Sequence, residues 1–123
     1  MKACDFLRDT NCVIYLQQGR LAAPLPPGRF ALSVINEIEL RSFSGLTDEQ
    51  ENALKALFDS VSIISLDDPV KEETIRLRRQ HRIKTPDAII VATALTQGAA
   101  LLTNDDRLRK IPGLETHAVS LRR

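Results

Sequence analysis

Five acidic residues stand where this sequence predicts the end of a strand or the first turns of a helix. They are Asp9, Glu39, Asp87, Asp105 and Asp106. Two carboxylates roughly 4 Å apart repel each other by about 4 kcal/mol at an effective dielectric constant near 20. A cluster of such groups must take up protons or share divalent cations. Oxygen ligands without cysteine or histidine favour Mg²⁺ or Mn²⁺, and such an ion can activate water and neutralise charge on a phosphoryl group.

Asp87 opens the most apolar helix that the sequence predicts. Residues 85–95 are apolar on every face of a helix, which a soluble protein tolerates only if the helix is buried. We expect Thr85 as its N-cap, Pro86 at its first helical position and Gly98 as its C-terminal stop. A carboxylate in that first turn gains from the helix dipole but loses its water. It therefore needs a cation or a hydrogen-bond donor beside it.

Short strands alternate with longer helices along the chain. We expect strands at residues 3–7, 30–33, 61–66, 99–103 and 116–121. We expect a first helix capped near Thr10 or Asn11 and further helices that begin near residues 34, 47, 68 and 85. Thr47 and Gln50 have the spacing of a capping box, and Asp68 is expected to cap the next helix before Pro69. The alternation predicts an α/β fold with a mainly parallel central sheet flanked by helices. Sites in such folds lie beyond the C-terminal ends of the strands, so the acids should converge at one edge.

The composition limits the class of protein. The chain of 123 residues suffices for a single domain over residues 1–123. Its net charge of +1 and charged fraction of 27% are those of an ordinary globular protein rather than of a strongly basic nucleic-acid binder. Cys4 and Cys12 are too few for a disulfide framework and are expected to be buried thiols. Without a signal-peptide pattern or an apolar run of about 18–20 residues, the sequence predicts a cytoplasmic protein that spans no membrane.

Each acid also has an ordinary structural explanation when it is taken alone. Asp9 would be a cap or turn former, and Asp87 would serve the helix dipole. Glu39 would lie on a solvated helix face, and Asp105 would belong to a turn. Only their expected convergence on one edge of the sheet favours a metal site.

Four motifs together resemble the PIN-domain nuclease family, and most closely its VapC-type toxins of bacterial toxin–antitoxin pairs. They are Asp9-Thr10-Asn11, Ser33 to Leu40, Lys84-Thr85-Pro86-Asp87-Ala88 and Leu102-Thr103-Asn104-Asp105. The resemblance covers essentially the whole chain. It implies a single PIN-like domain that hydrolyses RNA with Mg²⁺ or Mn²⁺ and leaves a 5′-phosphate on the downstream product. It further implies a homodimer and a small antitoxin protein that covers the cleft.

The resemblance also assigns roles to individual residues. The four acids that match the family's metal-binding and catalytic positions are Asp9, Glu39, Asp87 and Asp105. Glu39 is preferred to the neighbouring Glu37 as the second acid. Asn11 and Thr103 match polar positions that orient the acids. Asp106 falls at a variable position and is expected at the surface.

Arg8 departs from the family pattern, which usually has an aliphatic residue there. Strand alternation directs its side chain away from Asp9, where the guanidinium must reach solvent or find an acid. Alternatively, it folds back onto Asp9 and competes with the metal. This second possibility keeps open a PIN-like domain that binds RNA without cleaving it.

A basic segment precedes the apolar helix. The residues expected to contact RNA there are Arg76, Arg79, Arg82 and Lys84. They form either a solvated helix end, which the helix dipole favours, or a rim that contacts phosphates beside an acidic site. Basic residues within 107–110 and at the C-terminus could extend this rim. Only five aromatic residues are present, so base stacking is not expected to dominate RNA affinity.

Two other folds with an acidic Mg²⁺ pocket fit the sequence less well. A signalling receiver domain needs an acid pair after the first strand and a lysine after the last one, whereas here Arg8 precedes Asp9. A haloacid-dehalogenase-type phosphatase needs a second aspartate two residues after the nucleophile, where this chain has Asn11. Leu54, Leu57 and Phe58 are expected either as core or as apolar surface for a partner.

Overall fold

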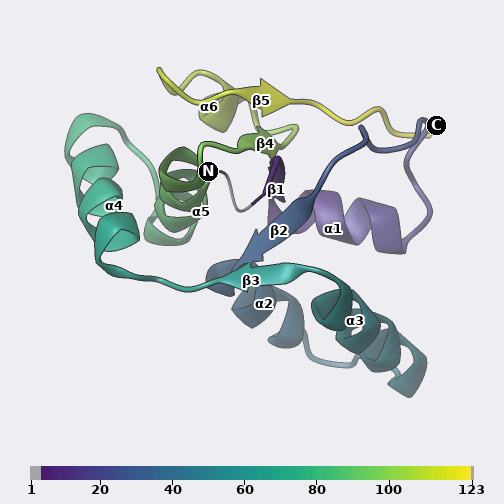
Figure 1. The fold of residues 1–123 in the computed structure, drawn as a ribbon. Helices are drawn as coiled ribbons and strands as arrows, with labels where there is room; N and C mark the ends of the chain where they lie inside the picture. Colours follow the sequence, from purple (N-terminus) through teal and green to yellow (C-terminus); the bar gives the residue numbers. More distant parts are fainter. Residues whose placement is uncertain (1–3, 123) are drawn as a thin grey trace.

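The computed structural model of the protein describes residues 4–122 and contains one parallel sheet. Its strands are β1 (Phe6–Arg8), β2 (Phe30–Ser33), β3 (Ser62–Ile64), β4 (Ala100–Leu102) and β5 (Thr116–His117). They are arranged in the order β3-β2-β1-β4-β5, and every neighbouring pair is parallel (Figure 1). The predicted α/β fold with a parallel central sheet is therefore confirmed.

Within residues 4–122, six helices are arranged around this sheet. They are α1 (Thr10–Gln17), α2 (Val34–Arg41), α3 (Asp48–Ser60), α4 (Asp68–Gln80), α5 (Thr85–Gln97) and α6 (Asp106–Arg109). Ala31 and Leu32 are adjacent in β2 and point to opposite faces of the sheet. Ala31 packs in a core with residues of α4 and α5, whereas Leu32 packs in a second core with residues of α1, α2 and α3. Helices thus cover both faces, as a parallel sheet requires.

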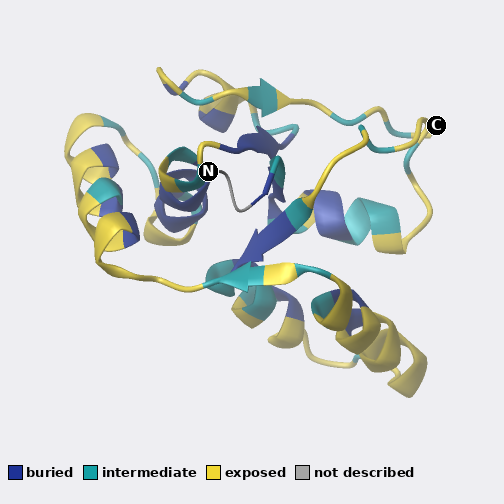
Figure 2. Cartoon of the chain, viewed as in Figure 1, coloured by how far each residue is buried: buried dark blue, intermediate teal, exposed yellow. Residues whose placement is uncertain are grey.

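Helix α5 is the most deeply buried helix of the fold. Residues 88–94 are all buried, and α5 is dark along most of its length in Figure 2. The helix ends at Gly98, whose φ of 63° lies in the left-handed region that glycine adopts without a steric penalty. Both the burial of this helix and its C-terminal stop are as predicted. Because every face is packed, the helix is a fixed support for the residue at its tip, Asp87.

Three helix starts differ from the prediction by one or two residues. Lys84, not Thr85, is the N-cap of α5, and no side chain caps this helix. Asp67, not Asp68, caps α4 by accepting a hydrogen bond of 3.0 Å from the Val70 amide. In both helices the proline is the second helical residue rather than the first. The first amides of a helix have no acceptor within it, so proline costs no hydrogen bond at either position. The third difference is in α1, whose cap is Asp9 rather than Thr10 or Asn11.

Four of the strands are shorter than predicted, β2 has its predicted range of 30–33, and one helix was missed. Strand β1 begins at Phe6 rather than at residue 3, which lies outside the described residues. No helix was expected after the strand at 99–103, yet α6 begins at Asp106 and is capped by Asp105. A helix of four residues is too short to show an apolar period. Leu108 of this helix is buried and anchors it to the core.

The apolar residues of α3 belong to the core. Leu54 and Leu57 are buried and pack with Leu32, and Phe58 is half-buried against the same cluster. The capping box of Thr47 and Gln50 at the start of this helix is confirmed. Cys4 and Cys12 are buried, as expected. Within residues 4–122 no helix is both long and apolar enough to cross a membrane.

We expect Leu101→Ala to lower the free energy of unfolding by about 2–5 kcal/mol, the usual cost of emptying a packed core site. Leu101 is fully buried in β4, an interior strand of the sheet. The measurement is the midpoint of urea unfolding. The control is Ile38→Ala, because the Ile38 side chain is 54% exposed and its loss should cost no more than about 0.5 kcal/mol. Equal losses in both variants would contradict the assigned core.

Candidate active site

A cavity of about 460 Å³ opens beyond the C-terminal ends of the strands. All four predicted acids line it, and each comes from a different segment. Asp9 follows β1, Asp105 lies shortly after β4, Glu39 lies on α2 and Asp87 lies in the first turn of α5. The parallel topology therefore brings together acids that are up to 96 positions apart in the chain. Asp106, expected at the surface, is exposed.

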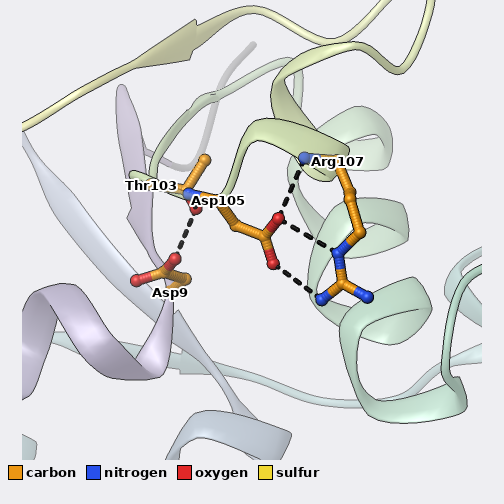
Figure 3. A network of polar contacts seen from close by, with 4 residues as sticks. All are labelled: Asp9, Thr103, Asp105 and Arg107. Atoms are coloured by element: carbon orange, nitrogen blue, oxygen red, sulfur yellow. Dashed lines mark hydrogen bonds and ion pairs between the residues drawn. The ribbon is translucent and has the colours of Figure 1, made fainter.

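Asp9 is held by two hydrogen bonds from neutral donors. One carboxylate oxygen accepts from the Cys12 amide at 2.7 Å, which is the cap of α1. The other accepts from the Thr103 hydroxyl. The Thr103 oxygen in turn accepts from the Asp105 amide at 3.0 Å, so this buried threonine links two of the acids (Figure 3). Thr103 thus lies where an orienting residue was expected.

Glu39 is positioned by a chain of polar side chains that was not expected from the sequence. The Ser33 amide donates to the Asn36 side-chain oxygen at 2.8 Å, and the Asn36 amide group donates to the Thr10 hydroxyl at 3.0 Å. The Thr10 hydroxyl then donates to Glu39 at 2.6 Å. Asn36 is fully buried. The signal that could have revealed it is its position three residues after Ser33, which is the spacing of a capping box.

Other predicted residues take less direct places around the cavity. Glu37 pairs with Arg41 at 3.4 Å and does not line the cavity, in keeping with the preference for Glu39. Asn11 lines the cavity but is exposed, and in the part of the chain that the structure describes it makes no hydrogen bond to the four acids. Its orienting role therefore stays a prediction.

Asp87 is the acid whose ionised form is least stabilised by its surroundings. Partial burial raises the pKa of its carboxyl group above the usual value, and the nearby Asp105, Glu39 and Asp9 raise it further. Arg107 opposes this shift only in part. A carboxylate in this position is stabilised by an added positive charge.

Asp105 differs from Asp87 because it already has a cation. The side chain of Arg107 donates to it, with Nη2 lying 3.1 Å from one carboxylate oxygen, and the Arg107 amide donates to the other at 2.9 Å. These hydrogen bonds hold the pKa of Asp105 below its usual value. Figure 3 shows the Asp105 carboxylate turned toward Arg107 and away from Asp9. Arg107 was expected to extend a basic rim, and its pairing with an acid of the site was not foreseen.

The donor set of the cavity has the chemistry of a site for a hard divalent cation. Its four acids offer only carboxylate oxygens, and Asp87 forms no ion pair within residues 4–122. In the arrangement that the structure gives to residues 4–122, no three side chains of histidine, cysteine, aspartate or glutamate lie close enough together to hold a metal ion. The orientation of Asp105 toward Arg107 separates one of the acids from the others. Binding of a cation by all four acids would therefore require this ion pair to open.

Arg8 takes a position that neither prediction described. Its side chain is only 7% exposed, and the guanidinium carbon lies 4.6 Å from the centre of the Phe30 ring. Two of its nitrogens, Nε and Nη1, are buried without a hydrogen-bond partner, and burial lowers the pKa of the group. The expectation that Arg8 reaches solvent or an acid is wrong, because the face of an aromatic ring on the adjacent strand attracts the cation instead. Arg8 does not line the acidic cavity.

The basic segment divides into two parts. Arg76 is engaged by Glu73 and Gln80 on the surface of α4, and Arg79 is exposed on the same helix. Arg82 and Lys84 instead lie in the connection between α4 and α5, where they line a second cavity. Only this second pair lies beside the acidic site.

We expect Asp87→Asn to stabilise the fold near pH 8 by a few tenths to about 1 kcal/mol, since water partly screens a half-buried carboxylate. The pKa of Asp87 is raised in the folded state, so its ionisation opposes folding above that pKa. This loss of stability disappears as the pH falls below the pKa that the aspartate has in the unfolded chain. The greater stability of the variant should therefore vanish near pH 4. Thermal unfolding at both pH values measures this. Asp106→Asn is the control, and an equal gain in stability in this variant would contradict the raised pKa assigned to Asp87.

We expect Arg107→Gln to raise the pKa of Asp105 toward its usual value, because the main cause of the lowered pKa is lost. Titration of the carboxyl carbon of Asp105 by NMR measures the change. Arg109→Gln provides a matched control, since Arg109 is exposed on the same short helix. An unchanged titration of Asp105 in the first variant would show that the ion pair does not form in solution.

Comparisons with known proteins agree with this geometry. The chain matches the PIN domain family over residues 7–114. A chain of a toxin–antitoxin complex from Klebsiella pneumoniae is 31% identical, with 89% of this chain and 95% of that chain covered and a TM-score of 0.75. No curated protein matches the chain.

Two further solved structures share the fold at lower identity. A chain of VapBC2 from Rickettsia felis, bound to a DNA fragment from the promoter, is 20% identical, with coverage of 94% and 98% and a TM-score of 0.78. A chain of VapBC-1 from nontypeable Haemophilus influenzae is 23% identical, with coverage of 92% and 96% and a TM-score of 0.75. The family predicted from the sequence motifs is thus confirmed, and this chain belongs to the PIN domain family.

Proposed function

We propose that this protein is a Mg²⁺- or Mn²⁺-dependent endoribonuclease and the toxin of a toxin–antitoxin pair. The observation that carries the proposal is the convergence of four carboxylates from four separate segments on one cavity. The family is one of nucleases, and the similar solved chains come from toxin–antitoxin complexes. RNA as the substrate, rather than DNA, rests on the resemblance to VapC-type toxins. Such a toxin would act on RNA in the cytoplasm.

The residues that would hold the ion are Asp9, Glu39, Asp87 and Asp105. A bound Mg²⁺ or Mn²⁺ supplies positive charge that stabilises the phosphoryl group in the transition state and lowers the pKa of the attacking water. The protein contributes the fixed positions of the acids. Thr103 holds Asp9, the chain through Asn36 and Thr10 holds Glu39, and the buried helix α5 holds Asp87. Fixing ligands in advance reduces the reorganisation needed during the reaction.

A domain that binds RNA without cleaving it is the second candidate function. Its support is the ion pair of Arg107 with Asp105, which keeps one acid away from the others. Arg8 no longer supports it through contact with the site, because its guanidinium stacks on Phe30. The two candidates differ in whether Asp105 leaves Arg107 when a divalent cation is present.

The proposed function predicts cleavage of single-stranded or structured RNA with Mg²⁺ or Mn²⁺ and none with EDTA. Asp87→Asn should reduce cleavage by more than about 100-fold, the upper end of what loss of an outer-shell partner costs a metal site. Asp106→Asn is the control for a lost surface carboxylate close to the site and should cleave at the wild-type rate. The readout is the rate of product formation on labelled RNA, with single-stranded DNA as a second substrate.

Each outcome assigns the function differently. Cleavage that persists in EDTA or in Asp87→Asn would overturn the metal-dependent mechanism. RNA that is retained but not cut would favour the binding-only domain. Cleavage of DNA alone would replace the RNA substrate while leaving the nuclease chemistry in place.

A small antitoxin protein and a second copy of this chain are the proposed protein partners. An apolar residue, Phe43, is 49% exposed and lines the acidic cavity, so a partner that covers the cavity would bury it. Co-purification with the product of an adjacent short gene, followed by measurement of the mass of the complex, tests both partners.

A further inference from the structure

A second cavity lies directly beside the acidic one. It has a volume of about 270 Å³, and its basic residues come from the α4–α5 connection and from α6 with the residue after it. They are Arg82, Lys84, Arg107 and Lys110. Asp87 and Leu108 line both cavities, so the two are contiguous. We refer to this second space as the basic cavity.

The positive charge of the basic cavity is largely uncompensated. Of the residues that the structure describes, Asp87 is the only acid in its lining. Among the described residues, some surface cations elsewhere are paired, as Lys71 is with Asp68 and Arg76 with Glu73. No such ion pair involves Arg82, Lys84 or Lys110 within residues 4–122. These three side chains therefore keep their charge available for an external anion.

The amino end of α5 adds to this charge. Lys84, the N-cap of the helix, and Asp87 in its first turn both line the basic cavity. No side chain caps this helix of 13 residues, so the positive end of its dipole is not compensated by a cap. Backbone amides at a helix start and flanking lysine side chains together favour phosphate.

The volume and the lining of the basic cavity suit a phosphate with its sugar. The rest of its lining consists of His81 and of the apolar residues Ile83, Leu108 and Ile111. At about 30 Å³ for each water molecule in the liquid, its volume corresponds to about nine waters, which is more than a single small ion needs. A site of this size, charge and mixed lining fits a segment of nucleic-acid backbone better than a lone anion.

We propose that the basic cavity binds a backbone phosphate of the RNA strand that flanks the phosphate at the acidic cavity. This rests on the proposed ribonuclease function. A strand crossing the acidic site carries further phosphates, and each of them is repelled by the carboxylates unless it has a cation of its own. A flanking phosphate held on one side of Asp87 fixes the register and the direction of the strand at the site of cleavage. Phosphate contacts have this positioning role in nucleic-acid recognition.

The test compares Lys84→Gln with Lys110→Gln and the double variant. Both side chains are exposed, so the folded state should survive, and thermal unfolding checks this. The interaction with the phosphate is the same before and during the reaction, so its removal should raise KM with little change in kcat. We expect KM of the double variant to rise about tenfold, the loss of about one charge-assisted hydrogen bond. The matched control is Lys55→Gln, an exposed lysine on α3 outside both cavities.

Two further readouts locate the bound phosphate. RNA binding is measured in EDTA at several salt concentrations, and the logarithm of the association constant is plotted against the logarithm of the salt concentration. The magnitude of the slope should decrease by about 0.7 for each phosphate of a single strand that no longer has a cationic partner. A series of RNAs with one neutral methylphosphonate linkage should show one flanking position that weakens binding to the wild type. At that position the neutral linkage should have no additional effect on the double variant, because the partner has already been removed.

The outcomes separate this proposal from the ribonuclease proposal. If RNA is cleaved and the double variant matches Lys55→Gln in KM, salt slope and linkage profile, the basic cavity does not bind the strand. If the wild type binds RNA through Lys84 and Lys110 but does not cleave it, the ribonuclease proposal fails and the phosphate site remains. If the double variant keeps RNA binding but loses the antitoxin, the basic cavity serves an acidic peptide and the proposal is overturned.

Discussion

Mutual repulsion among four carboxylates is the constraint on which the arrangement of this domain depends. Left to themselves, Asp9, Glu39, Asp87 and Asp105 would move apart into solvent. The fold prevents this for Asp87 by placing it at the tip of a helix whose residues 88–94 are all buried. The raised pKa of Asp87 shows that the position is unfavourable for a carboxylate in the absence of a cation. The fold therefore loses stability at Asp87, where the proposed reaction needs a negative charge. Such a trade-off between stability and activity is common in enzymes.

The four acids are held in three different ways. Asp9 and Glu39 accept hydrogen bonds from neutral groups, the Cys12 amide and the hydroxyls of Thr103 and Thr10. Asp105 is held by a cation, Arg107, and Asp87 is held by the packing of its helix. Neutral donors fix a carboxylate while leaving its charge available to a metal ion, whereas a guanidinium neutralises it. Asp105 is accordingly the acid that must change its partner if all four are to bind one cation.

The sequence was sufficient to predict the parallel sheet, the buried helix and the convergence of the acids, because each depends on patterns of several residues. Alternation of apolar segments predicts the topology, and the topology places Asp9 and Asp105 at one edge. The features that escaped prediction depend on single side-chain contacts. The contact of Arg8 with Phe30 requires knowledge of the register of β1 and β2, in which Phe30 pairs with Phe6, two residues before Arg8. The contact of Thr10 with Glu39 joins two helices, and the four residues of α6 are too few to form a pattern.

The contrast between α5 and α6 divides the acidic cavity into a fixed wall and an adjustable one. Helix α5 is packed through residues 88–94, so it can neither turn nor slide without opening the core. Helix α6 has four residues, of which only Leu108 is buried, and the Arg107 side chain beside Asp105 is 71% exposed. Exposed side chains change rotamer at little cost, whereas packed ones do not. Adjustment of this site to an ion or a substrate is therefore confined to the α6 side, and Asp87 provides the fixed point to which the other groups adapt.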